Sequence, residues 1–153
     1  MSTEVSRLYA SKRQGIVTAM AEQLKVIDGN GAYLTDLDCR AEPTLKYWDE
    51  IEQFPAVHIN AGSESREYIG AGHKNRFLSV TLRLYVNEEE SVNALDSLIE
   101  DVETVLEDNS RLAYKDKLGV QQYTHQITII SIDTDEGVLD PIGVAEMLVE
   151  VRY

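Results

Sequence analysis

The chain has 153 residues, and its 27 acidic residues against 14 Lys and Arg give it a formal net charge of −13. Such a charge disfavours binding to nucleic-acid phosphates, because like charges repel at long range, but it suits a protein lining a passage through which DNA slides. The single cysteine, Cys39, excludes an intrachain disulfide. With no leader-like N-terminus and no apolar run near the ~20 residues of a bilayer span, we expect one cytosolic domain, residues 1–153, and no membrane contact.

The first half of the chain predicts one helix followed by short, irregular elements. Residues 4–28 carry an apolar stripe at helical spacing, with Gly15 as a weak point. Residues 32–40 predict an extended segment, residues 43–53 a short helical pattern, and residues 56–60 a strand. Residues 61–75 have no periodicity and contain three glycines. We therefore predict a long loop there, of a kind that is commonly functional or mobile.

The second half shows clearer periodicity. Residues 76–86 alternate between apolar and other side chains, which predicts a strand with one face on the core. Residues 91–108 predict a one-sided amphipathic helix with an acidic outer face. Residues 122–133 and 144–153 predict an antiparallel pair of strands joined by a short turn. This order predicts an α+β fold, a mainly antiparallel or mixed sheet of about four to five strands with two main helices packed on one face.

Motifs for catalysis or metal binding are absent from the sequence. The three histidines, His58, His73 and His125, fall in different elements without the spacing of metal ligands. The acidic stretch 133–137 resembles a calcium loop, but position 143 is Gly where such a loop needs Glu. We therefore predict no catalytic residue, no cofactor and no metal site.

Three stretches of the C-terminal half carry a family resemblance: the helix 91–108, the strand and turn Ile130–Gly137, and the closing Gly143–Tyr153. Together with the strand Leu78–Val86 and the apolar Pro55–Val57 before it, they resemble the tail terminator, or tail-completion, proteins of long-tailed bacteriophages. The resemblance covers residues 55–153, and the first 54 residues only through the placement of their helix. Residues 36–53 do not match the family pattern.

The resemblance implies a structural subunit, not an enzyme, that closes into a hexameric ring. The ring would sit on the last ring of the tail tube, stop tube growth and offer a new surface to the neck or head. The implied partners are other copies of the chain, the tail tube protein and a neck or head-completion protein, while DNA passes through without specific binding. The expected location is the virion tail, after assembly in the host cytoplasm.

On this interpretation, three groups of residues are candidate contact sites. Tyrosine and leucine on strand faces that are otherwise polar suit an interface between subunits. The interface group is Tyr85, Leu148, Glu150 and Arg152. The group for contact with the tube or neck is Ser63, Arg66, Tyr68, His73 and Lys74, and the group for the lumen wall is Glu88, Glu89, Glu90, Asp135 and Glu136.

Two alternative functions remain open at this point. The first is another neck or head-completion connector, which shares the lack of reactive residues but has a different partner. The second is a small ferredoxin-like enzyme or ligand-binding domain. Its active residues would be His58 or His125 beside Asp133.

Overall fold

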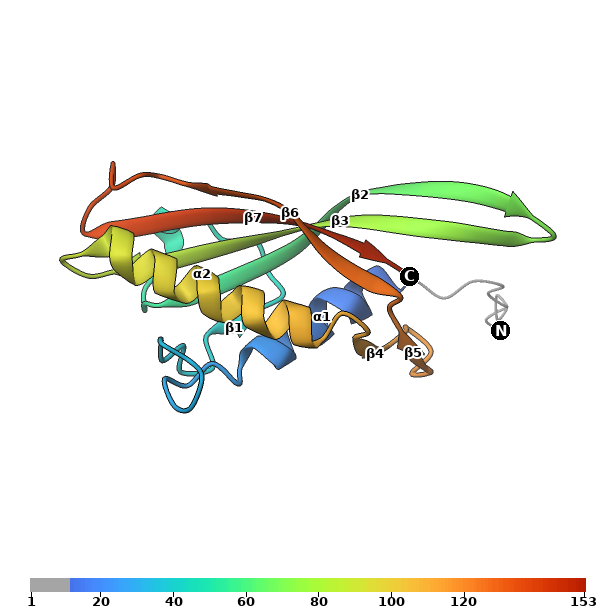
Figure 1. Cartoon of the computed structure of the whole chain (residues 1–153), viewed down its shortest axis with the longest axis horizontal. Coiled ribbons are helices and arrows are strands. Elements are labelled where there is room, and N and C mark those ends of the chain that lie inside the picture. Colours follow the sequence, from blue (N-terminus) through green and yellow to red (C-terminus); the bar gives the residue numbers. More distant parts are fainter. Residues whose placement is uncertain (1–11) are drawn as a thin grey trace, which may run out of the picture.

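The computed structural model describes residues 12–153 and confirms the α+β class (Figure 1). The main sheet has five strands, and all neighbouring strands are antiparallel except the first pair. In spatial order they are β1 (Ala41–Glu42), β2 (Ala56–Gly70), β3 (His73–Asn87), β7 (Ile142–Arg152) and β6 (Gln126–Thr134). The other elements are α1 (Arg13–Leu24), η1 (Trp48–Glu50), α2 (Ser91–Asp108) and a small second sheet of β4 (Ala113–Lys115) and β5 (Gln121–Tyr123).

One face of the sheet is apolar, and both helices cover it (Figure 1). Alternate residues of β3, including Leu78, Leu82 and Leu84, are fully buried there. The stripe of α2 that the sequence predicts packs against β3, β7 and β6. Because both periodic patterns face the same core, the strand at 76–86 and the helix at 91–108 are confirmed.

The opposite face of the sheet carries mostly polar side chains, and among residues 12–153 neither α-helix packs on it. A row of paired residues crosses it from strand to strand: His58, Arg83, Glu146 and Asp133. Arg83 lies at the centre of this row and donates hydrogen bonds to Asn60 Oδ1 at 2.6 Å and Glu146 Oε1 at 3.3 Å. We call this surface the open face.

The largest difference from the sequence prediction concerns residues 61–75, which are not a loop. They form the outer part of the hairpin between β2 and β3, and they pair from Glu64 and Leu78 out to Gly70 and His73. We call residues 65–76 the arm, because β3 pairs with β7 only from Phe77 onward and the hairpin projects beyond the sheet (Figure 1). Both sides of the arm meet solvent, so no alternation of apolar residues marks it as a strand.

Three other predicted elements differ in the structure. The helix predicted at 4–28 is an α-helix over Arg13–Leu24, and residues 4–11 lie outside the described part. Residues 32–40 form turns with an isolated bridge between Asp28 and Asp36, and residues 43–53 hold only the short η1. The strand predicted at 122–133 divides into β5 and β6, which belong to different sheets.

The division falls at Thr124, which is fully buried. Its hydroxyl donates to Ser110 O at 2.9 Å and accepts from Leu112 N–H at 2.8 Å. These bonds join the segment that follows α2, at Ser110 and Leu112, to the link between β5 and β6. The two strands diverge at this link. Among residues 12–153, no helix is long and apolar enough to cross a membrane.

Candidate functional site

The sheet has two edges that lack a strand partner over most of their length. β6 pairs only with β7, so its outer side is unpaired among the described residues. β1 pairs with β2 only at Val57 and His58, so within residues 12–153 no strand pairs with the outer side of β2 from Ile59 onward, although α1 borders that side at residues 60–62. Free edges present backbone N–H and C=O groups that readily pair with another chain.

The edge strand β6 also exposes an apolar side chain. A register shift between Ile129 and Ser131 places Ile130 at a bulge, and its side chain is 53% exposed. The sequence analysis did not single out Ile130, because it reads as one apolar residue in an apolar run. Its position at an irregularity of the pairing is visible only once the register is known.

The arm brings together most of the residues predicted to contact a tube or neck. Arg66, Tyr68, His73 and Lys74 all lie on it, and Ser63 is at the bulge where it joins the sheet. Near the tip, Tyr68 is 72% exposed, and the Lys74 ammonium lies 5.7 Å from the centre of its ring. Ile69, which the prediction omitted, is 59% exposed beside it.

The base of the arm is fastened to the rest of the protein by side chains. The Tyr153 hydroxyl donates to Glu64, the Arg66 Nε donates to the same carboxylate at 2.8 Å, and Arg13 donates to Gly62 O. Burial by itself would raise the pKa of Glu64, but the hydrogen bonds from Tyr153 and Arg66 outweigh it and lower that pKa. The arm therefore leaves the sheet in a defined direction.

The predicted interface residues divide into two sets. Leu148, Glu150 and Arg152 lie on the open face in β7, with Leu148 37% exposed. Tyr85 is only 1% exposed, so its proposed place at a subunit interface is wrong for the folded chain. The segment 43–54 covers it, and its hydroxyl donates to Lys46 O.

Burial raises the pKa of Tyr85 to about 12. Its neutral form is the one that the fold favours, so its contribution to stability is complete below pH ~10 and is lost as the pH rises from about 10 to about 12. Tyr85→Phe should lower the free energy of unfolding by about 1 kcal/mol through loss of the hydrogen bond. In an ultraviolet pH titration, the same substitution should remove a tyrosine that titrates near pH 12. A tyrosine titration identical to that of the native chain would contradict this assignment.

The predicted lumen acids gather at the end of the sheet opposite the arm. Glu88, Glu89 and Glu90 are exposed between β3 and α2, and Glu88 N–H donates to Pro141 O in the link before β7. Asp135 stabilises the turn between β6 and β7. Its carboxylate accepts hydrogen bonds from the N–H groups of Gly137, Leu139 and Val144 at 3.1–3.4 Å. Glu136 is exposed in the same turn.

The residues of the enzyme alternative are not brought together. His58 is 5% exposed, burial lowers its pKa, and its Nδ1 lies 3.2 Å from the hydroxyl of Thr44. β3 and β7 separate His58 from Asp133, which puts them roughly 14 Å apart at the usual spacing of neighbouring strands. His125 and Asp133 lie at opposite ends of β6, roughly 26 Å apart at the usual rise per residue. Neither pair can share a proton.

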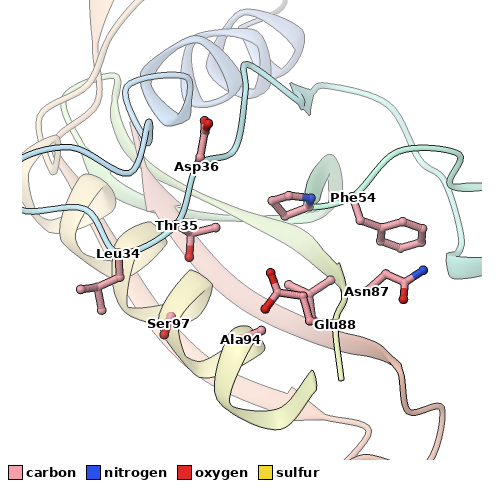
Figure 2. A pocket seen from close by; sticks show the side chains of 10 residues that line it. Leu34, Thr35, Asp36, Phe54, Asn87, Glu88, Ala94 and Ser97 are labelled. Carbon is pink, nitrogen blue, oxygen red and sulfur yellow. The ribbon is translucent and has the colours of Figure 1, made fainter. Parts of the chain in front are cut away.

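A hollow of about 270 Å³ lies near the acidic end, and Figure 2 shows the side chains that line it. Its walls come from the loop at 34–36, the residues 54–55 before β2, and the junction of β3 with the first turns of α2. Its charged residues are Asp36 and Glu88, and none of the three histidines lines it. In the described part of the chain, no group of three or more His, Cys, Asp or Glu is placed to hold a metal ion.

Within residues 12–153, the geometry thus defines a class of protein that presents free sheet edges and a projecting hairpin. The sequence profile of the family described as Bacteriophage Tail Tube Terminator Protein matches residues 10–153, so the chain belongs to this family of phage tail structural proteins. It is also 31% identical to the tail tube terminator protein p142 of Escherichia phage T5, over 92% of each chain. The family resemblance found in the C-terminal half is therefore confirmed, and it extends into the N-terminal half.

Proposed function

We propose that copies of this chain close into a hexameric ring on the end of a phage tail tube, stop its polymerisation and provide the surface for joining to the neck or head. The observation that carries the proposal is the pair of free edges on opposite sides of one sheet. A contact between two different edges is heterologous, and a heterologous contact closes into a ring when its rotation allows.

The direction of the strands suits such a contact. β2 and β3, β3 and β7, and β7 and β6 are each antiparallel, so β2 and β6 run in opposite directions. In a ring whose axis follows the strands, every copy has the same orientation. The β2 edge of one copy, beyond the part at residues 60–62 that α1 borders, therefore meets the β6 edge of the next as an antiparallel pair, which a backbone ladder can join.

The other candidate residues take roles that follow from their positions. Leu148, Glu150 and Arg152 lie on the open face, where a neighbouring copy or the lumen would meet them. The arm carries Tyr68 and Lys74 beyond the sheet, where they would contact the tube. Glu88, Glu89, Glu90 and Glu136 would face away from the tube, near the passage for DNA, where like charge prevents sticking.

A charge on the free edge tests the ring. Ile130→Lys places a cation on the exposed bulge of β6, and charges on edge strands oppose pairing with another chain. We expect light scattering after size exclusion to show a closed oligomer for the native chain and a monomer for Ile130→Lys. Val138→Lys is the matched control, because Val138 is 83% exposed in the turn outside the edge and should leave the oligomer intact.

Two results would overturn the proposal at different levels. If the native chain stays monomeric at all concentrations and neither binds tubes nor limits their length, the terminator ring is wrong. If the native chain forms rings and Ile130→Lys forms them equally well, the ring stands but its contact does not use the β6 edge.

A further inference from the structure

Cations gather at the arm-side end of this acidic chain. Lys12 and Arg13 precede and open α1, and Arg13 reaches the base of the arm at Gly62 O. The pKa of Lys12 is lowered by burial and then by repulsion from Arg76, with Asp116 acting in the opposite direction. Positive charges from α1 and the arm are therefore close enough to disfavour each other. Such a concentration is unexpected in a chain with a net charge of −13.

Two hollows lie side by side on α1 at this end. One, of about 490 Å³, is bounded by α1, Pro43 and the part of β2 that α1 borders, at Asn60 and Ala61. The other, of about 470 Å³, lies between α1 and the β4–β5 hairpin. They share Gln14, Thr18 and Lys117, so they form one groove across the outer side of the helix. We call it the α1 groove.

The two cations of the β4–β5 hairpin are available to a partner. Among the described residues, Lys115 and Lys117 have no ion-pair partner. The neighbouring acids are already engaged, since Asp116 accepts from the backbone N–H groups of its own turn and Glu22 pairs with Lys25 at 2.7 Å. Within residues 12–153, the groove therefore offers two cations, Lys115 and Lys117, that form no ion pair.

Apolar side chains accompany these charges. In the hairpin that follows Lys117, Leu118 is 65% exposed and Val120 is 52% exposed. Val17, Pro43 and Ala61 line the groove itself. Exposed apolar residues next to free charges are typical of surfaces that contact other proteins.

We propose that the α1 groove and the β4–β5 hairpin dock onto an acidic surface on the end of the tail tube, so that the arm-side end faces the tube and the acidic end faces away. This inference rests on the proposed function and adds a direction to it. Opposite charges on two docking surfaces favour one orientation, because the reversed orientation places like charges in contact. If this chain docked by its opposite end, Glu88, Glu89 and Glu90 would lie against the acidic partner.

An acidic protein surface fits this end better than DNA does. The cations are few and lie among apolar side chains, whereas binding to phosphates needs many cations along a path. The remaining acids of the chain would also repel a polyanion at long range. A protein surface with several carboxylates satisfies Lys115 and Lys117 and also covers Leu118 and Val120.

Charge reversal at the hairpin tests the proposal. The probe is preformed tubes of the tail tube protein from the same phage, and binding is measured by co-sedimentation at several salt concentrations. The double variant Lys115→Glu/Lys117→Glu should bind at least about tenfold more weakly than the native chain, and native binding should weaken with salt. The matched control is Lys46→Glu, compared with the single variant Lys117→Glu. Lys46 lies outside the groove, so Lys46→Glu makes the same change of charge and should bind within about twofold of the native chain.

A second pair tests direction. Glu89→Lys/Glu90→Lys alters the opposite end and should leave affinity for tubes within about threefold of the native value. Thermal melts and oligomer mass confirm that each variant folds and assembles. Equal binding by the hairpin variant and the native chain would overturn the docking surface while leaving the ring intact, as would a loss in Lys46→Glu equal to that in Lys117→Glu. Displacement of tubes by a double-stranded DNA fragment at physiological salt, dependent on Lys115 and Lys117, would overturn the choice of a protein partner. Failure of the native chain to bind tubes would overturn the proposed function itself.

Discussion

Asp101→Ala should lower the free energy of unfolding by about 3 kcal/mol, because it removes a buried, charged carboxylate that accepts from two part-buried backbone N–H groups. The Asp101 side chain is 2% exposed in the middle of α2. Its carboxylate accepts from Leu34 N–H at 3.0 and 3.1 Å and from Thr35 N–H at 2.8 Å. These bonds fasten an otherwise irregular loop to the helix, and without them both N–H groups lose their partners.

Two variants separate this loss from a general effect on the helix. Asp101→Asn keeps one carbonyl acceptor and should lose about half as much stability as Asp101→Ala. Asp96→Ala removes an exposed acid from the same helix and should change stability by less than about 0.5 kcal/mol. Denaturant unfolding gives the free energies, and hydrogen exchange at Leu34 and Thr35 should speed up only in the Asp101 variants. Unchanged exchange at these two amides would contradict the assignment.

Gly15→Ala should destabilise the protein by about 2 kcal/mol and loosen the β4–β5 sheet, although alanine is the better helix former. A Cβ at residue 15 would lie 1.9 Å from the carbonyl oxygen of Lys115. That atom belongs to the backbone of β4, so it cannot rotate away as a side chain could. α1 and β4 must move apart, and the gain of about 1 kcal/mol in helix propensity does not offset the lost packing.

The neighbouring Gln14→Ala is the matched control. Gln14 is exposed on the same turn of α1, so this substitution should be neutral or slightly stabilising. Denaturant unfolding measures the stability, and tryptic cleavage after Lys115 or Lys117 reports the loosening of the hairpin. If Gly15→Ala were as stable as the native chain and equally resistant to trypsin, the close approach of helix and strand would be wrong.

The elements predicted correctly are those with one buried side. The strand 76–86 and the helix 91–108 show clear periods because every second residue of the strand, or one stripe of the helix, faces the core. The arm has the same backbone structure as β3 but is exposed on both sides, so its sequence shows no period. The loop predicted at residues 61–75 was therefore wrong, because a strand that is exposed on both sides shows no periodicity.

The candidate site was predicted in part. Residues such as Tyr68 and Lys74 were identified as a contact region because they are polar or aromatic and lie in a segment without a core pattern, and the structure places them on the arm. Tyr85 was misplaced because the segment 43–54 that covers it shows no periodic pattern that would assign it a position. Ile130 was not identified, because its place at a bulge depends on the register of β6 with β7. The cations around the α1 groove were not identified, because they come from distant parts of the chain.

The sequence alone determined the acidity, the α+β class and the order of elements that carries the family resemblance. The class and the order can be predicted because buried apolar side chains recur with the period of the helix or strand that carries them. The tertiary structure decided which sheet edges stay free, where the arm points and how Lys115 and Lys117 come to flank α1. These features depend on backbone hydrogen bonds and on approaches between distant segments. Backbone groups are chemically alike at nearly every residue, so their pairing leaves little trace in the sequence.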